Sequence, residues 1–295
     1  MLKEISIEII RKCPNNCLHC SSFSNKNCSE IIPYELFKKV VSGAKNLGLK
    51  TVCFSGGEPF LHPDIIEMIE YVYDIGLDSY VYSSGIYMDK DDIRGPIPQQ
   101  IFDRISNKVT KIIYNIEATQ KETYDIIMGT HGCFEFLKES IRRTTEAGVV
   151  AEGHFVPNRL NQNQIEETLQ FCIGLGVSKV SFLRLVNHGR ARENSDKLLL
   201  SNEQIADIKC KLVKILNENK YSIRIGVPLL GETEECHCEA ANGKLNIRYD
   251  GKVFPCEVFK NNGVEPLSDC EPDNIYEKSI EYIYKDCLLY TSPSP

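Results

Sequence analysis

Several features that mark common protein classes are missing from this sequence of 295 residues. No apolar stretch approaches the roughly 18 residues that a membrane-spanning helix needs, so we expect no membrane partner. Basic residues are not in excess, because 34 Lys and Arg stand against 41 Asp and Glu and leave a net charge of −7. This balance argues against a nucleic-acid partner or an anionic membrane surface, both of which bind a basic face.

The sequence also lacks a secretion signal, a low-complexity tract and an internal repeat. Its opening, MLKEISIEII, alternates like a strand and has neither a cationic start nor a cleavage site. Hydrophobic residues make up 42% and charged residues 25%, as in an ordinary globular protein. We therefore expect a cytoplasmic protein with one full-sized domain and a smaller appendage.

Cysteine is the residue present in excess, with 13 in the chain. In a reducing compartment this density indicates metal binding more often than disulfides. Three cysteines fall within residues 13–20, and a second group near the C-terminus consists of Cys236, Cys238, Cys256 and Cys270. Four others lie among apolar neighbours and are expected to be buried packing residues, namely Cys53, Cys133, Cys172 and Cys210.

Strand-like and helix-like segments alternate through the first two-thirds of the chain. The strand candidates are rich in Val, Ile, Tyr and Phe and lie at 3–10, 51–55, 78–83, 111–117, 149–156 and 179–185. Helical periodicity follows at 34–48, 63–75, 133–147 and 163–175. Six consecutive strand–helix units predict an α/β fold with a parallel sheet covered by helices.

Polar residues at alternate strand positions refine this expectation. They are Glu4, Ser6, Glu8, Asn115, Glu117, Glu152, His154 and Arg184. Side chains two positions apart share one face of a strand, so one face is apolar and the other lines a polar interior. A strand covered by helices on both faces would instead be apolar throughout. The pattern favours a curved, incompletely closed TIM-like (β/α)6 barrel around a ligand, although any single polar residue could instead face solvent.

The pattern changes after residue 190. Residues 191–230 predict a connector with a long helix, capped by Ser201 or Asn202, and a strand in YSIRIGV. Residues 231–286 hold the second cysteine group and NIRYDGKVF, which predicts a hairpin with Asp250-Gly251 at its turn. We expect this part to form a small, separate, metal-binding module.

Cys13, Cys17 and Cys20 directly follow the first strand, in CPNNCLHC. Thiolates are ligands that iron–sulfur clusters and zinc favour. Three of them in one loop can bind three irons of a four-iron cube and leave the fourth iron open. A structural zinc site, the alternative, needs a fourth protein ligand. His19 is expected to point away from the metal, and Cys28 lies in a loose polar loop, so the pattern favours iron–sulfur.

A second motif, Ser55-Gly56-Gly57-Glu58-Pro59, ends the second strand. Two glycines allow a backbone to approach a ligand closely, and a carboxylate beside them can accept hydrogen bonds from an ammonium group. A Gly-Gly pair alone is more often a simple turn. The combination of this motif with the cysteine loop after the first strand is far more specific than either motif alone.

At these residues the chain resembles the radical S-adenosylmethionine (SAM) superfamily. The resemblance implies that the three cysteines bind a [4Fe-4S] cluster and that SAM chelates its open iron. It also implies that the GGEP segment contacts the SAM amino group. Such an enzyme reductively cleaves SAM to a 5′-deoxyadenosyl radical, which abstracts hydrogen from a substrate. The electron would come from a donor such as flavodoxin or ferredoxin.

The resemblance adds further candidates for SAM binding. Ser83 corresponds to a polar residue that often touches the ribose, and Glu117 stands where the family usually has Asp. Arg184 could pair with the SAM carboxylate or, inside the barrel, with Glu152. His19 is also included among the cofactor-binding candidates.

The second cysteine group resembles the SPASM extension of peptide-modifying radical SAM enzymes. Its signature fits Cys238, Gly251 and Cys256, with Cys270 as a further ligand, and it implies an auxiliary iron–sulfur cluster. Cys236 could replace Cys238, and a small zinc knuckle is the alternative. The resemblance implies a ribosomally made peptide substrate. A sulfatase-maturing enzyme, a small-molecule dehydrogenase and a non-enzymatic metal-binding module are the alternatives.

The end of the chain departs from this family pattern. The segment DNIYEKSIEYI matches the family, but the cysteine-rich run expected after it does not follow. Residues 287–295 instead read CLLYTSPSP, which resembles a sequencing adaptor translated in frame. We interpret them as non-native, the alternative being a genuine Ser/Pro tail. The expected organisation is a barrel at 1–190, the connector, and an incomplete SPASM-like module at 231–286.

Overall fold

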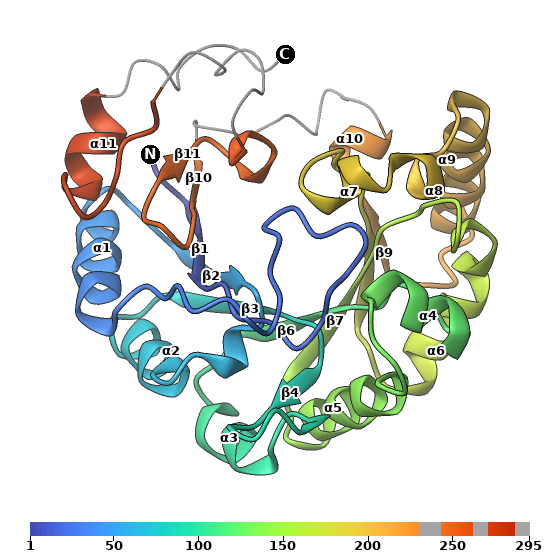
Figure 1. Cartoon of the computed structure of the whole chain (residues 1–295), viewed down its shortest axis with the longest axis horizontal. Helices are drawn as coiled ribbons and strands as arrows, with labels where there is room; N and C mark the ends of the chain where they lie inside the picture. The colour runs from blue at the N-terminus through green and yellow to red at the C-terminus, as the bar shows by residue number, and fades with distance from the viewer. Residues whose placement is uncertain (231–242, 262–270, 287–295) are drawn as a thin grey trace.

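A computed structural model describes residues 1–230, 243–261 and 271–286. A nine-stranded sheet, ordered β11-β10-β1-β2-β3-β6-β7-β8-β9, forms a curved wall with helices outside it (Figure 1). Its central strands are β1 (Glu4–Ile10), β2 (Thr51–Gly56), β3 (Asp78–Ser83), β6 (Lys111–Asn115), β7 (Val150–Phe155) and β8 (Lys179–Phe182). All six pair in parallel. They correspond to the six predicted strands and confirm the partial-barrel fold.

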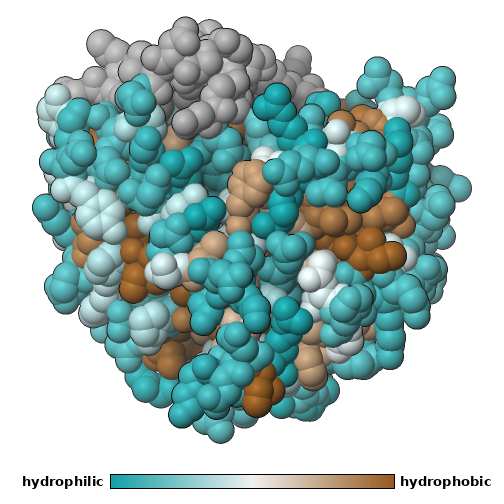
Figure 2. Space-filling model, in the orientation of Figure 1, coloured by the Kyte–Doolittle hydropathy of each residue, from teal (hydrophilic) through white to brown (hydrophobic). Residues whose placement is uncertain are grey.

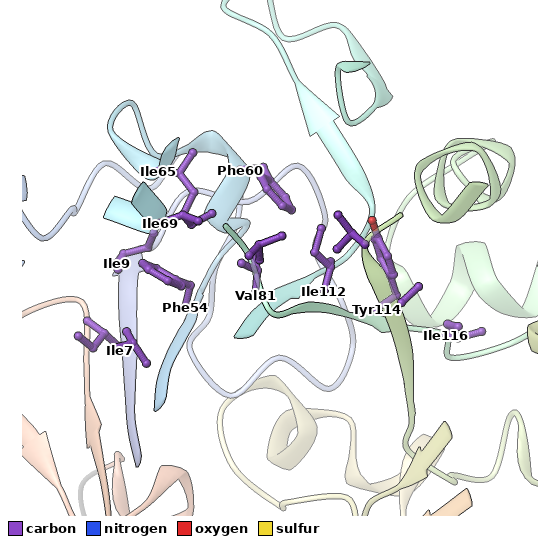
Figure 3. Packing of buried hydrophobic residues seen from close by; sticks show 14 of the residues in the cluster. Ile7, Ile9, Phe54, Phe60, Ile65, Ile69, Val81, Ile112, Tyr114 and Ile116 are labelled. Carbon is purple, nitrogen blue, oxygen red and sulfur yellow. The ribbon is translucent and has the colours of Figure 1, made fainter. Parts of the chain in front are cut away.

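The four helices predicted between the strands are also present. They are α1 (Tyr34–Asn46), α2 (Ile65–Asp74), α5 (Phe134–Glu146) and α6 (Ile165–Gly174). Each turns an apolar stripe toward the outer face of the sheet. Figure 3 shows Ile9, Phe54 and Ile69 gathered in this layer, and Phe54 of β2 stacks on Phe37 of α1 with ring centroids 5.5 Å apart.

Several short elements were not predicted. A hairpin of β4 (Ile86–Met88) and β5 (Arg94–Pro96) leads into α3 (Gln99–Ile105), and α4 (Lys121–Met128) follows β6. The small helices α7 (Arg190–Glu193) and α8 (Ser195–Leu198) follow β8. Single turns of 3-10 helix lie at Pro59–Leu61, Gln162–Gln164 and Glu257–Phe259. These elements are too short for a periodic pattern to identify them.

The connector is largely as expected. Ser201 caps α9 (Asn202–Asn217), and Gln204 completes a capping box with it. The predicted strand is β9 (Ile223–Ile225), which pairs in parallel with β8 and so extends the barrel sheet; α10 (Val227–Leu230) follows it.

The predicted hairpin is present, but the expectation that it stands apart from the barrel is wrong. β10 (Lys244–Ile247) pairs in parallel with β1, and β11 (Val253–Phe254) pairs antiparallel with β10. The hairpin therefore completes one edge of the main sheet, where β1 would otherwise leave its backbone groups unpaired. The last helix, α11 (Ile280–Asp286), packs beside α1 (Figure 1).

The scattered cysteines behave as predicted with one exception. Cys53, Cys133 and Cys172 are buried, whereas Cys210 is exposed. The buried stripe of α9 consists of Ile208, Leu212 and Ile215, and Cys210 lies off that stripe. Packing was therefore the wrong expectation for Cys210.

Among the described residues no helix is both long and apolar enough to cross a bilayer. Hydrophilic side chains dominate the face shown in Figure 2, with apolar side chains in separate groups between them.

Candidate functional site

A cavity of about 430 Å³ occupies the interior of the barrel. Its wall includes residues of β1, β2, β3, β6, β7 and the hairpin, together with the loop after β1, which crosses the barrel opening in Figure 1. The predicted site residues that line it are Cys13, Cys17, His19, Cys20, Ser55, Gly56, Gly57, Ser83, Glu117, Arg184 and Cys256. Most of the polar strand positions face this interior, as their alternation predicted.

The three cysteines of the loop share this cavity. Cys13 is buried, and Cys17 and Cys20 are partly buried. Burial raises the pKa of the Cys13 and Cys17 thiols well above the ordinary value. Within the described ranges, no three Cys, His, Asp or Glu side chains gather closely enough to hold a single metal ion. Thiolates are the ligands of iron–sulfur clusters, and these three thiols line one cavity.

Hydrogen bonds with distant elements fix the loop. The N–H groups of Asn16 and Leu18 donate to the last carbonyls of α4, at 3.1 and 2.8 Å. Arg190 of α7 donates from Nε to the Cys17 carbonyl at 2.7 Å and from Nη2 to the Ser24 carbonyl at 2.8 Å. Its own N–H donates to the Cys20 carbonyl at 3.0 Å. Arg190 was not among the sequence candidates, although it holds the loop in place on both sides of Cys20.

The Gly-Gly turn also supports the cysteine loop. The N–H of Gly57 donates to the Ile10 carbonyl at 2.6 Å, and the N–H of Glu58 donates to the Lys12 carbonyl at 2.9 Å. A Cβ on Gly57 would lie 2.1 Å from the Lys12 oxygen, and one on Gly56 would lie 2.1 Å from the Ile10 oxygen. The close approach that requires glycine is therefore to the chain itself, and not only to a ligand as predicted.

Glu58 does not face the cavity, in contrast to the expected contact with SAM. Its carboxylate is fully buried and accepts bonds from the Ser83 hydroxyl at 2.8 Å, the Ser84 N–H at 2.8 Å and the Ser84 hydroxyl at 2.6 Å. Burial raises the pKa of Glu58 to about 7, although these bonds oppose the shift. Pro59 is buried in the turn that follows. Glu58 is thus a positioning residue that holds Ser83 at the cavity wall.

Glu117 and His19 meet inside the cavity. His19 Nε2 lies 3.5 Å from Glu117 Oε1, and the Val156 N–H donates to Glu117 Oε2 at 3.4 Å. Burial raises the pKa of Glu117 to about 8, and burial together with the Arg190 charge lowers that of His19 to about 4. His19 Nδ1, Glu117 Oε1 and both amide atoms of Asn15 are buried without a hydrogen-bond partner. Buried polar atoms are normally paired with protein groups or water, so these atoms can also accept or donate to a bound group.

The family follows from a comparison with known proteins. Residues 7–172, more than half of the chain, match the family described as the radical SAM superfamily. This chain belongs to the radical SAM superfamily. It is a radical SAM enzyme, and the family's cofactors are a [4Fe-4S] cluster and SAM.

Curated relatives of this radical SAM enzyme include two kinds of cyclase. PqqA peptide cyclase of Bradyrhizobium diazoefficiens is 24% identical over 264 residues, which cover 87% of this chain and 67% of that protein. A probable GTP 3′,8-cyclase of Saccharolobus islandicus is 24% identical over 277 residues, covering 90% of this chain and 86% of that protein.

Solved structures support the fold. SuiB of Streptococcus suis bound to S-adenosylmethionine superposes with a TM-score of 0.77 at 16% identity, covering 98% of this chain and 67% of that one. The structure titled anSMEcpe with bound AdoMet gives a TM-score of 0.70 at 16% identity, covering 97% and 78%. These values show that the partial barrel is shared.

The residues of the cavity fit the family's cofactors. The three thiols would hold three irons, and the partnerless atoms of Asn15, His19 and Glu117 are available to the polar groups of SAM. Arg184 also lines the cavity, whereas Glu152 pairs with Lys111 at 3.0 Å. The alternative Arg184–Glu152 ion pair is therefore wrong.

The segment that follows the C-terminal hairpin adds one residue, Lys260, that the sequence did not reveal as functional. Lys260 is buried at the cavity wall and donates from Nζ to Glu8 Oε1 at 2.5 Å and to the Ser22 hydroxyl at 3.0 Å. Burial alone would lower the pKa of Lys260, but the Glu8 carboxylate more than offsets this and raises it. Cys256 lines the same cavity. The predicted ligands Cys238 and Cys270, the alternative Cys236 and the predicted tail lie outside the described residues.

Proposed function

We propose that this radical SAM enzyme modifies a ribosomally synthesised peptide by abstracting hydrogen from it. The observation that carries the proposal is the polar cavity, which holds the three thiols at one end and reaches the hairpin side of the barrel. A cavity of this size is in the range of small-molecule cofactor sites. Two comparisons support a peptide: relatives named PqqA peptide cyclase, and the SuiB structure bound to its precursor peptide SuiA.

When bound, the cluster and SAM supply the 5′-deoxyadenosyl radical that removes the hydrogen. The protein's own residues bind and orient the reactants. Arg190 and the Gly-Gly turn hold the cysteine loop, Glu58 fixes Ser83, and Glu117 with His19 offers polar atoms to SAM. The barrel walls exclude water from the reacting groups. Cys256 in the same wall supports an auxiliary cluster close to the substrate.

A small-molecule substrate is the second candidate. Relatives named probable GTP 3′,8-cyclase match this chain at the same 24% identity as the peptide cyclase and over more of their length. In either case we propose that the electron comes from a donor such as flavodoxin or ferredoxin, and that the enzyme works in the cytoplasm without a nucleic-acid or membrane partner.

Anaerobic reconstitution with iron and sulfide tests the proposal. The protein should produce 5′-deoxyadenosine from SAM, and Cys17→Ala should abolish this production. Cys28→Ala is the matched control, because Cys28 does not line the cavity, and it should retain SAM cleavage. Full cleavage by Cys17→Ala would contradict the assignment of the loop.

The substrate class needs a separate assay. Peptides encoded by short open reading frames beside the gene, and GTP, are incubated with the reconstituted enzyme and SAM and then analysed by mass spectrometry. We expect a mass loss of about two hydrogens in one peptide, as bond formation after hydrogen abstraction requires. Conversion of GTP with no change in any peptide would overturn the peptide proposal and leave the radical SAM assignment standing.

A further inference from the structure

The wall formed by β1 and β10 contains polar atoms that the cofactor site does not explain. In the register of the two strands, Asn246 lies opposite Ser6, and both side chains line the cavity. Asn246 is 1% exposed, and neither Oδ1 nor Nδ2 has a hydrogen-bond partner. Leaving a buried amide unpaired on both sides destabilises the fold, so its retention calls for a ligand.

Two ion pairs flank Asn246 on this wall, and the Glu257 carboxylate accepts from the Ser6 hydroxyl at 3.4 Å. On one side of Asn246 along the wall, Lys244 pairs with Glu4 at 3.3 Å. On the other side, Lys260 pairs with Glu8. Glu8 is 1% exposed and uses only Oε1 for this pair, whereas its Oε2 is buried without a partner. Between two ion pairs, the wall thus presents an amide donor, an amide acceptor and one carboxylate oxygen.

This set of atoms selects for a particular chemistry. A carboxylate offers only acceptors and an ammonium group only donors, so neither satisfies both atoms of Asn246. An amide offers an N–H beside a C=O and satisfies both. Because Lys260 offsets the Glu8 charge, Glu8 Oε2 can accept a second N–H without a cationic ligand.

We propose that Asn246 and Glu8 Oε2 form a subsite that binds an amide group of the substrate. If the proposed function holds, as this assignment assumes, the amide is a peptide bond of the substrate peptide. The lactam edge of a guanine base has the same N–H and C=O pattern, so the experiment must separate these two sources. The hairpin supplies Asn246 and β1 supplies Glu8, whose Oε1 also accepts from the Ser22 hydroxyl of the cysteine loop at 2.7 Å.

The first measurement needs no ligand. Asn246→Leu keeps the shape of the side chain and removes the unpaired amide, so the melting temperature should rise by about 2–4 °C. Asn158→Leu is the matched control, since Asn158 is equally buried but donates to the Val156 carbonyl at 3.1 Å and accepts from the Leu160 N–H at 2.9 Å. That variant should melt lower. A fall in melting temperature for Asn246→Leu would show that its amide is already satisfied and would overturn the subsite.

The second measurement uses two probes on the reconstituted, SAM-bound enzyme. Saturation-transfer NMR should detect binding of acetyl-triglycine amide, and Asn246→Leu should weaken it about tenfold. Binding that does not depend on Asn246, or no binding of either probe, would overturn the subsite. Binding of guanosine in place of the peptide, with the same dependence on Asn246, would keep the amide subsite and contradict the peptide substrate. Loss of SAM affinity in Asn246→Leu would assign the amide to the cofactor instead.

Discussion

Arg190 offers the sharpest test of how the protein prepares the cluster loop. Its guanidinium makes two charge-assisted bonds to loop carbonyls, at 2.7 and 2.8 Å. Bonds of this kind contribute about 1.5–3 kcal/mol each, and Arg190 is only partly buried, so their combined loss should cost about 2–4 kcal/mol. Its charge also helps to lower the pKa of the Cys17 thiol, against the larger effect of burial.

The perturbation is Arg190→Gln, compared with Arg190→Lys and with Arg192→Gln as a control on the same helix. Arg192 is exposed, so its loss should change neither stability nor iron content. Arg190→Gln should lower the melting temperature of the metal-free protein by about 5 °C or more. After reconstitution it should also hold less iron per chain and lose iron faster to a chelator.

Arg190→Lys separates charge from geometry. Lysine keeps the positive charge beside Cys17 but cannot reproduce the planar fork that reaches two carbonyls. We expect it to recover only part of the lost stability and iron retention. If Arg190→Gln matches Arg192→Gln in melting temperature and in the rate of iron loss, the loop does not depend on this clamp and the reasoning fails.

Three further changes probe other parts of the site. Gly57→Ala should lose stability and bound iron, because its Cβ would meet the Lys12 oxygen at 2.1 Å. Gly95→Ala, which has open space around the added Cβ, should lose neither. Melting curves and iron assays compare the two variants. Glu58 has a pKa of about 7 when folded, above the 4.5 of the free group, so the folded state binds the extra proton and stability should fall as pH rises through that window. In urea unfolding across this pH range, the free energy of unfolding should fall by on the order of 3 kcal/mol, and Glu58→Gln should remove this fall. An unchanged pH dependence in the variant would refute the assignment. Lys260→Met should cost about 3–5 kcal/mol, because Glu8 would stay buried without a counter-charge and keep only its bond from the Ser22 hydroxyl. Adding Glu8→Gln to Lys260→Met should restore most of the lost stability in the same unfolding assay. If stability does not recover, the unpaired Glu8 charge is not the cause of the loss.

The regular part of the fold could be predicted from the sequence. The six central strands and four of the helices follow from local periodicity. Apolar residues repeated every two positions share one face of a strand, and those repeated about every 3.6 positions share one face of a helix. The cysteine loop and the Gly-Gly turn are likewise local motifs. Their chemistry depends on residue types that lie close together in the sequence.

The supporting residues could not be predicted in this way. Lys260 and Glu8 are 252 positions apart, and Arg190 and Cys17 are 173 apart, so no local pattern connects them. Glu58 was identified by its motif, but its contact was not, since only the folded structure shows that Ser83 and Ser84 take up both of its oxygens. The place of β10 beside β1 was missed for the same reason.

The pairing of β10 with β1 has a consequence for how this enzyme is made. During synthesis, β1 emerges first and β10 emerges more than two hundred residues later, so one edge of β1 stays open until β10 has been made. Lys260, which closes over Ser22 in the cluster loop, arrives later still. The cysteine loop therefore reaches its final surroundings only when the β10–β11 hairpin docks, and cluster insertion is expected to follow that step. Until then the exposed edge is a point at which nascent chains can pair with one another, and the cell must protect it.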